Sequence, residues 1–466
     1  MDRKPQRITA IAATITLVVS ACAGATSSAS PSTAGASAAT AASAAASPSP
    51  AGPVTLTHWY YDFPPFANYQ KARAAAFQTA NPGVTIKYDS SIPPVGEGGY
   101  EDKVTSSLAT GTAPDIFSVI SPQAPRIISL GQLAPIDANA LTALGYASVD
   151  ALKASRVDGA FDAWTDAQGN VYGIPDAISF YNLYCNNDQL KKGGVDPATV
   201  SIKTWDDFLA MGQKVIAGNP TFYKNASGKW THNFIKLPMY QDDTWSMQTL
   251  TQFLAQTGGS VLAADGKSST INQPAAVTAV DEMMKISRTL GDPNIGPTVP
   301  GEIHSAVASG DQTCGLAGEW FYGAFLKPTN SKLLGHYTAF ALPRMTADKP
   351  GNVFWGWSFV VNAKSPNKDV AWKYIGNLTA DPNGIVQDVG IWPPVKDIQT
   401  LQAVKDTPFG DVIAANREGG QHIFKSLKYT DIARLIRGQL EAMATQGTPV
   451  QSTLDQVAQQ INDIVK

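Results

Sequence analysis

The sequence predicts an α/β protein with two lobes, each organised as a doubly wound sheet with helices packed against it. Two observations lead to this prediction. Strand-like and helix-like segments alternate along the first part of the folded chain, and this order is typical of a parallel sheet with crossover helices. The part of the chain after residue 53 is also too long for one simple core, which favours two lobes.

The first five elements are predicted from the period of their apolar residues. Residues 54–61 (VTLTHWYY) form a strand that the following prolines terminate, and Phe66, Tyr69, Arg73 and Phe77 then fall at helical spacing. Apolar and polar residues alternate over 84–88, helical spacing returns over 100–108, and 115–120 is a third strand. Since ligands of such sheets bind beyond the carboxyl ends of the strands, the residues after the first and third strands should share one mouth.

The later elements are predicted from similar signals. Thr204 is a capping residue in front of an amphipathic helix. Residues 352–361 (NVFWGWSFVV) form a strand on which Trp355 and Trp357 point to the same face, because side chains alternate across the pleat. Further strands are predicted at 180–186 and 313–317, helices at 245–256 and 274–290, and a segment crossing between lobes at 336–342.

The N-terminus carries the pattern of an export signal. A basic start precedes an apolar stretch of about 12 residues, which is too short to span a membrane, and then Val19-Ser20-Ala21-Cys22. This end resembles the lipobox of bacterial lipoproteins, so residues 1–21 are predicted as a lipoprotein signal peptide and Cys22 as the lipid-bearing residue. An ordinary secretory signal is the alternative. Residues 22–53 consist almost entirely of Ala, Gly, Ser, Thr and Pro and are predicted as a disordered tether.

Composition excludes some classes of function. The 35 basic and 38 acidic residues give a net charge of −3, which argues against a nucleic-acid partner. The five histidines lack the spacing of metal ligands, so we expect no metal and no cofactor. Outside the lipobox only Cys185 and Cys314 remain. In an exported protein they can form a disulfide or stay as two buried thiols, and the sequence leaves both open.

Six short phrases resemble, in order, the signatures of family 1 of the extracellular solute-binding proteins. These are the sugar-binding lipoproteins of ABC importers, a group that includes maltose-binding protein. The resemblance runs from about residue 54 to 400. The matching phrases are ATGTAPDI (109–116), VYGIP (171–175), NLYCNND (182–188), TWDDF (204–208), GLAGEW (315–320) and SPNK (365–368) followed by Ala371-Trp372.

The resemblance implies a periplasmic-binding-protein-like fold, in which two α/β lobes are joined by crossing strands and close around a solute. Lobe 1 would comprise residues 54–182 plus 337–388. Lobe 2 would comprise 183–336 plus 389–466. The protein would be extracytoplasmic, lipid-anchored to the cell membrane through Cys22 and monomeric, and its partners would be a carbohydrate ligand and the permease subunits of an ABC importer.

The resemblance and the positions of aromatic and acidic residues together give a candidate binding site. A pyranose buries its C–H face against an aromatic ring, and its hydroxyl groups need hydrogen bonds in exchange for lost water. The resemblance implies roles for Trp59, Asp62, Gln123, Trp320, Trp355 and Trp357. Position at a strand end or turn adds Tyr61, Asp243, Trp245, Glu319 and Trp392. Residues 118–123 depart from the more aromatic and acidic version in maltose-binding protein, so the sugar itself is left open.

The expected function is capture of a sugar or oligosaccharide by hinge closure and delivery to a permease, without catalysis. Two alternatives remain open at this point. One is a binder of another solute, such as a polyamine or a phosphorylated compound. The other is a surface hydrolase acting on glycans, since Asp62, Asp243 and Glu319 could supply the two carboxylates that such an enzyme needs.

Overall fold

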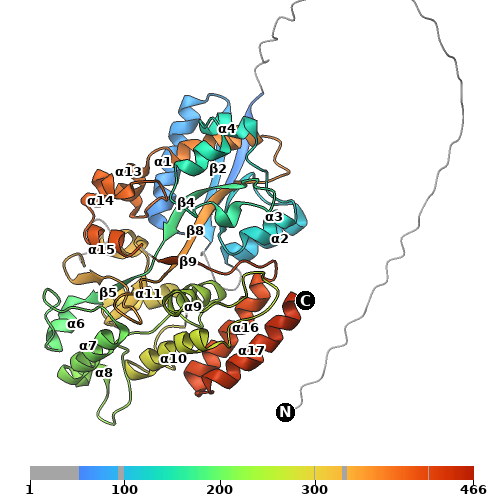
Figure 1. Cartoon of the computed structure of the whole chain (residues 1–466). Coiled ribbons are helices and arrows are strands. Elements are labelled where there is room, and N and C mark those ends of the chain that lie inside the picture. Colours follow the sequence, from blue (N-terminus) through green and yellow to red (C-terminus); the bar gives the residue numbers. More distant parts are fainter. Residues whose placement is uncertain (1–51, 93–98, 299, 328–332, 418) are drawn as a thin grey trace, which may run out of the picture. The chain divides into compact units, whose positions relative to one another are not determined.

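The computed structural model describes residues 52–92, 99–298, 300–327, 333–417 and 419–466 (Figure 1). The predicted signal peptide, Cys22 and all but the last two residues of the predicted tether lie outside the described residues. Among the described residues, no helix combines the length and the apolar character that crossing a bilayer would require.

A mixed sheet forms the first half of the fold. Its strands run in the order β2-β1-β3-β8-β4, and β9 pairs with β8. Strands β1, β2 and β3 are parallel, as the alternation of strands and helices predicts, whereas β8 runs antiparallel to β3 and β4. The strands are β1 (Val54–Tyr61), β2 (Val84–Ile92), β3 (Ile116–Ile120), β4 (Gly173–Ser179), β8 (Asn352–Val361) and β9 (Gly420–His422).

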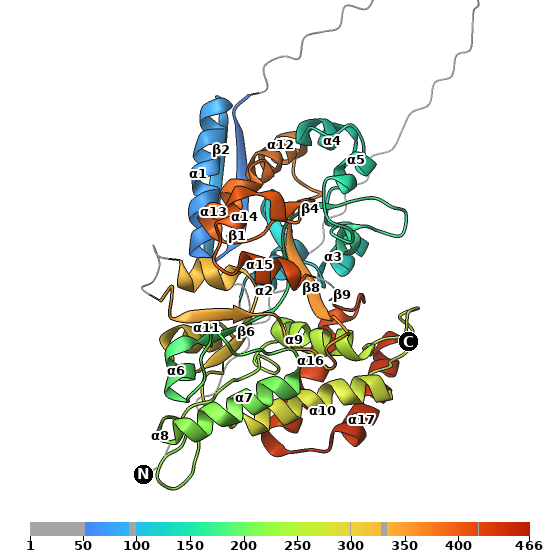
Figure 2. The same ribbon diagram turned by 60° about the vertical axis from the view of Figure 1, so that its left-hand side comes forward.

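Helices from distant parts of the sequence cover this sheet. Helix α1 packs against β2, α12 and α13, and α12 also packs on α4 (Figure 2). The helices around the sheet are α1 (Pro64–Ala80), α2 (Tyr100–Thr110), α3 (Ala124–Ser129), α4 (Ala138–Leu144), α5 (Val149–Ala154), η1 (Asp162–Trp164), α12 (Lys368–Thr379), α13 (Pro382–Val389), η3 (Ile398–Thr400) and α14 (Gln402–Lys405). Helix α15 (Gly410–Ala415) packs against α14 and against a strand of the second sheet.

A second, three-stranded sheet has the order β6-β5-β7, and both pairs are antiparallel. The parallel pattern is therefore confined to the first sheet. Helices α9, α10, α16 and α17 pack on one another in the lower part of Figure 1. The elements are β5 (Asn182–Asn186), α6 (Asn187–Lys192), α7 (Trp205–Gly218), α8 (Pro220–Tyr223), α9 (Asp243–Thr257), α10 (Pro274–Thr289), α11 (Pro300–Ser309), β6 (Cys314–Ala317), η2 (Tyr322–Leu326), β7 (Tyr337–Phe340), α16 (Tyr429–Glu441), η4 (Ala442–Gln446) and α17 (Val450–Val465).

The chain crosses between the two sheets through short segments. It passes from β4 to β5 through Phe180 and Tyr181, and it returns from β7 to β8 through residues 341–351. The strand predicted at 180–186 therefore begins at Asn182. The crossing predicted at 336–342 is wrong for most of its length, because residues 337–340 are β7, which pairs within the second sheet, and the chain crosses only after it. Two sheets joined by crossing segments confirm the predicted fold class, and the predicted lobe boundaries remain a prediction.

Buried asparagines tie the crossing segments together. The side chain of Asn352 accepts a hydrogen bond from the Tyr181 amide at 3.0 Å and donates to the Tyr181 carbonyl at 2.8 Å. Asn416 donates to the side chain of Asn182 at 3.0 Å and accepts from the Leu342 amide at 3.1 Å. Because these groups are buried, each lost partner would leave an unsatisfied polar atom, so the network fixes where the chain passes from one sheet to the other.

The structure forms a disulfide between Cys185 and Cys314, one of the two alternatives that the sequence leaves open. The two cysteines are direct partners on the antiparallel strands β5 and β6, with their Cα atoms 4.1 Å apart. Both side chains are fully buried.

Candidate functional site

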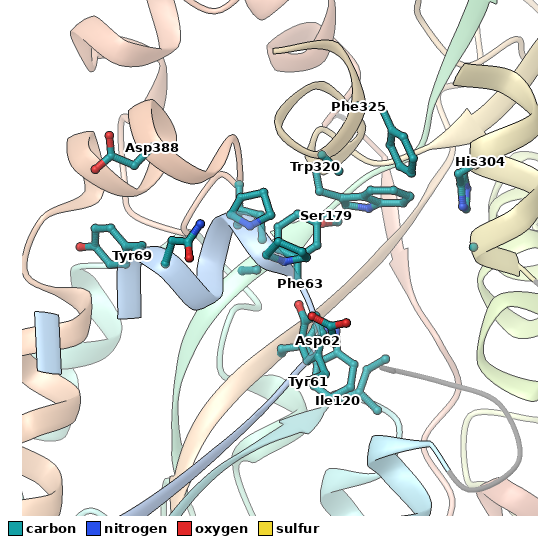
Figure 3. Close-up of a pocket in the computed structure, with 18 of the residues that line it drawn as sticks. Tyr61, Asp62, Phe63, Tyr69, Ile120, Ser179, His304, Trp320, Phe325 and Asp388 are labelled. Atoms are coloured by element: carbon teal, nitrogen blue, oxygen red, sulfur yellow. The ribbon is translucent and has the colours of Figure 1, made fainter. Parts of the chain in front are cut away.

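A cavity of about 1030 Å³ lies where the ends of the first sheet meet α9, α11 and the segment that follows β6 (Figure 3). From the first sheet come the ends of β1 and β3 and parts of β4 and β8. From the other side come α9, α11, and the turn and helix that follow β6. Its lining residues are Tyr61, Asp62, Phe63, Pro64, Pro65, Asn68, Tyr69, Ala72, Arg73, Ile120, Ala177, Ser179, Thr244, Trp245, Gln248, Gly301, His304, Trp320, Ala324, Phe325, Lys327, Trp355, Trp357, Asp381, Asp388 and Ile391.

The first sheet contributes an aromatic wall to the cavity. Trp355 and Trp357 both line it, as the period of two in β8 predicts, and both are largely buried. The Tyr61 ring lies 4.5 Å from the Trp357 ring, centroid to centroid. These rings support one another and keep their remaining surface toward the cavity.

Gly356 is the residue that allows the two tryptophans to sit on β8. Gly356 has no side chain on the face of β8 opposite the two tryptophans. There the backbone of β4 passes so close that a Cβ at position 356 would overlap the carbonyl oxygen of Ala177. The strand pairing shifts register here, between Pro175 and Ala177. The sequence Trp-Gly-Trp therefore combines a wall on one face with a close backbone approach on the other.

A second aromatic group faces the cavity from the other side. The Trp320 ring lies 4.8 Å from the His304 ring and 5.7 Å from the Trp245 ring, both edge to face. Trp320 packs directly over Gly318. A Cβ at position 318 would overlap the indole, so the ring can lie here only because this residue is glycine. Trp245 and Trp320 are only partly buried, so they keep surface available to a ligand.

Polar groups lie between and beside the aromatic walls. Asp62, Asn68, Ser179, Thr244 and Gln248 line the cavity and supply carboxylate, amide and hydroxyl groups. This mixture of rings with a few polar groups is typical of a small-molecule site.

The charged lining residues nearly balance one another. Three are acids, Asp62, Asp381 and Asp388, and two are bases, Arg73 and Lys327. The guanidinium of Arg73 already donates to the Asn377 carbonyl, and the Lys327 ammonium donates to the Asp388 carbonyl at 3.1 Å. The cavity therefore offers neither a cluster of free cations nor an acidic wall without aromatics.

The structure brings six of the eleven sequence-predicted residues together in this cavity: Tyr61, Asp62, Trp245, Trp320, Trp355 and Trp357. The other five lie elsewhere. Trp59 is on the other face of the first sheet, where the Lys103 ammonium lies 4.0 Å from its ring centroid. Gln123 precedes α3 and donates to Glu101 at 3.3 Å. Our proposed site leaves both residues out.

Asp243 and Trp392 also lie outside the lining. The Asp243 carboxylate accepts from Arg437 at 2.6 Å and lies 3.7 Å from Arg434, so its charge is used to hold α16 to the start of α9. Trp392 is 1% exposed and belongs to a small core with Val386 and Ile398. Both residues have structural roles in this arrangement.

Glu319 lies beneath the cavity and connects its two sides. Its carboxylate accepts a hydrogen bond from Ser179 of β4 at 2.9 Å, and it directly precedes Trp320. Burial raises the pKa of Glu319 to about 7, although hydrogen bonds and the nearby Arg417 act in the opposite direction. We interpret Glu319 as a support for Trp320 and not as a group that contacts a ligand.

Several lining residues were missed by the sequence analysis. Pro64, Pro65, Asn68, Tyr69, Ala72 and Arg73 follow the spacing of one face of α1. That face mixes polar and apolar residues, so the apolar period used to predict the helix does not reveal it. His304 lies on α11, and its contact with Trp320 depends on the packing of α11 against the turn after β6.

Buried acids near the cavity predict an unusual pH dependence of stability. Burial raises the pKa of Asp176 from 3.8, and that of Glu319 from 4.5, to about 7 in each case. Between those ordinary values and pH 7 the folded state holds protons that the unfolded state releases, so the free energy of unfolding should fall as the pH rises through this window. Urea unfolding of the ligand-free protein should therefore show a higher midpoint at pH 5 than at pH 8. Asp176→Asn should reduce the difference, and a midpoint that rises with pH would contradict the prediction.

In the part of the chain that the structure describes, no group of three or more His, Cys, Asp or Glu side chains could hold a metal ion.

The architecture is that of a solute-binding protein: two sheets, short crossings between them, and a ligand-sized cavity beside the crossings. A model of the bacterial extracellular solute-binding protein family matches residues 62–385, which is more than half of the chain. The protein belongs to this family.

Individual relatives are distant. The lactose-binding protein of Rhizobium radiobacter is 25% identical over 338 residues, which cover 71% of each chain. A protein of Sinorhizobium fredii, named as an amino-acid ABC transporter periplasmic-binding protein, is 21% identical over 64% of this chain and 65% of its own length. The solved structure of a solute-binding protein from Thermotoga lettingae with α-D-tagatose has a TM-score of 0.74 at 18% identity, covering 88% of this chain and 100% of that chain. That structural similarity concerns the fold.

Proposed function

We propose that this protein captures a sugar or oligosaccharide outside the cytoplasm and delivers it to the permease of an ABC importer. The single observation that carries the proposal is the pair of aromatic walls, Trp355 and Trp357 on one side and Trp245 and Trp320 on the other, that line one cavity. Rings on two sides suit a pyranose, which has an apolar C–H surface and polar edges. The lactose-binding relative supports the same ligand class.

The charge of the lining argues against the other solute classes. A polyamine site needs an acidic wall, and a phosphate site needs several free cations. Here Asp62, Asp381 and Asp388 are offset by Arg73 and Lys327, and both cations already donate to backbone carbonyls. A neutral hydroxylated ligand fits this balance better than either charged alternative.

Capture would proceed by closure of the two sheets around the ligand. A ligand held by Trp355 and Trp357 adds contacts to Trp245 and Trp320 when the two sides approach, so the closed state gains population by that differential affinity. The crossing segments at 180–181 and 341–351 are where such a motion would bend the chain. A micromolar dissociation constant corresponds to about 8 kcal/mol, which stacked rings and several hydrogen bonds can supply.

The remaining parts of the proposal concern location and assembly. The N-terminal pattern supports lipid anchoring through Cys22, and we propose that the protein acts as a monomer at the outer face of the membrane. We also propose that it has no catalytic activity. Chromatography of a bound sugar after long incubation should recover it intact, whereas cleavage products would favour the glycan hydrolase.

Trp320→Ala should weaken sugar binding at least tenfold, because it removes most of the second aromatic wall while leaving the strands in place. The change is measured by calorimetry with a sugar that a thermal-shift panel identifies, since a ligand raises the melting point by mass action. Trp230→Ala is the matched control: Trp230 is also half-buried, but it packs against Lys224 away from the cavity. Unchanged affinity of Trp320→Ala would remove this indole from the site.

A further inference from the structure

The cavity extends along helix α1, well beyond the four tryptophans that line it. Figure 3 shows Tyr69 of α1 and Asp388 of α13 on the left, away from Trp320 and His304 on the right. The α1 residues in the lining fall into two adjacent rows with a spacing of four, which is one face of a helix. They are Pro64, Asn68 and Ala72 in one row and Pro65, Tyr69 and Arg73 in the other. The role proposed above for the aromatic walls uses only the other end of the cavity.

The geometry of α1 gives the length of this extension. The Tyr61 ring lies 4.5 Å from the Trp357 ring, so the start of α1 adjoins the aromatic end of the cavity. An α-helix advances 1.5 Å per residue, so Pro64 and Arg73 are about 14 Å apart along its axis. A pyranose ring, whose single bonds are each about 1.5 Å long, spans about 5 Å between its two linking oxygens. A ring held between the tryptophans therefore leaves room for further rings along α1.

The side chains of α1 leave this part of the cavity accessible. Asn68 and Ala72 lie one turn apart, line the cavity and are exposed. The helices η2 and α13 both pack against α1, and they contribute Phe325 and Asp388 to the lining. The space between the three helices thus continues the cavity that the tryptophans line.

The helices η2 and α13 are held against each other at this end. Gly323 of η2 lies so close to the end of α13 that a Cβ there would overlap the Val389 carbonyl oxygen. Lys327, just after η2, donates to the Asp388 carbonyl at 3.1 Å. These contacts fix the segment that follows Trp320 to a helix packed on α1, so the extension is bounded by α1, η2 and α13.

The chemistry of the extension suits a neutral ring with hydroxyl groups. The Asn68 amide and the Asp388 carboxylate are groups that form hydrogen bonds with hydroxyls. Pro65 and Phe325 add apolar surface for the C–H groups of a sugar. The extension therefore offers the same kinds of contact as the aromatic end, without its indole rings.

We propose that the α1 face, from Pro64 to Arg73, forms a second subsite, which binds the further units of an oligosaccharide whose first ring lies between the tryptophans. The inference rests on the proposed function and adds to it the length of the ligand, which is three units or more. Recognition of the further units depends on Asn68 and Ala72, and this dependence can be tested with sugars of different length.

The test compares two-unit and four-unit members of the maltose, cellobiose, xylobiose and N,N′-diacetylchitobiose series by calorimetry. In the series that binds most tightly, the four-unit sugar should bind about tenfold more tightly than the two-unit sugar, because its added contacts exceed the cost of ordering it. Ala72→Trp fills the extension from an exposed position on α1, so it should reduce this ratio to below about twofold. Trp320→Ala should weaken both lengths and keep the ratio.

Ala80→Trp is the matched control, since Ala80 is an exposed alanine of the same helix, two turns beyond Ala72 and outside the lining. It should change neither affinity. If Ala72→Trp does not fold, Asn68→Trp decides in its place.

The outcomes separate this inference from the proposed function. If no sugar of the four series binds wild-type protein, the proposed function fails and the inference with it. If sugars bind but the four-unit member gains nothing over the two-unit member, only the inference fails. A ratio that survives Ala72→Trp, or that falls equally in Ala80→Trp, would also overturn the second subsite.

Discussion

Replacing Gly356 by alanine should destabilise the protein by about 3 kcal/mol or more and abolish high-affinity ligand binding. The added methyl group would overlap the Ala177 carbonyl oxygen, so β4 and β8 would have to separate. Both strands are buried and line the cavity on the side of the first sheet, and backbone cannot move aside as a flexible side chain can. Trp355 and Trp357 would be displaced together.

Gly376→Ala is the matched control for this prediction. Gly376 lies in helix α12, and a Cβ there would meet only Ala143 and Leu144 at an ordinary 3.6 Å. Alanine should stabilise the helix by about 0.5–1 kcal/mol relative to glycine. Urea unfolding of both variants, with calorimetry of any folded fraction, measures the contrast. Equal midpoints for Gly356→Ala and wild-type protein would show that β4 and β8 do not approach as closely as described.

Four strands of the first sheet, β1, β2, β3 and β8, could be predicted from sequence because their information is local, whereas β4 and β9 were not predicted. The alternation over 84–88 and the helical spacing over 66–77 each describe one element, and the order of such elements implies parallel pairing. The same period of two placed Trp355 and Trp357 correctly on one face. Local patterns are reliable where the chain is regular, and β8 is regular through its tryptophans.

The sequence did not place the residues whose surroundings depend on irregular or distant backbone. The register shift near the end of β1 leaves Trp59 on one face and Tyr61 in the cavity, although regular alternation would have kept them together. Asp243 lies at the start of a helix and was predicted to bind the ligand. Its carboxylate instead pairs with Arg434 and Arg437, which lie far along the chain. Neither a register shift nor a long-range ion pair has a signature in the nearby residues.

Removing the disulfide between Cys185 and Cys314 should also lower the stability of the protein strongly. A double Cys185→Ala, Cys314→Ala variant should lose about 5 kcal/mol of unfolding free energy, because the bond closes a sequence separation of 129 residues and so restricts the unfolded chain. Reducing agent should lower the urea midpoint of the wild-type protein toward that of the variant, and it should leave the variant unchanged. Peptide mapping of unreduced protein should recover the two cysteines in one cross-linked species, whereas separate peptides with free thiols would contradict the bond.

The same variant should also lose affinity, because both bonded strands lead directly to the site. β5 begins just after the crossing at Phe180 and Tyr181, and β6 ends one residue before Gly318, on which Trp320 rests. Without the bond, the two strands keep their backbone pairing but lose the covalent link near their far ends. Affinity that falls together with stability would show that the disulfide helps to hold the Trp320 wall. Affinity that stays constant in protein shown to be fully folded would limit the bond to stability.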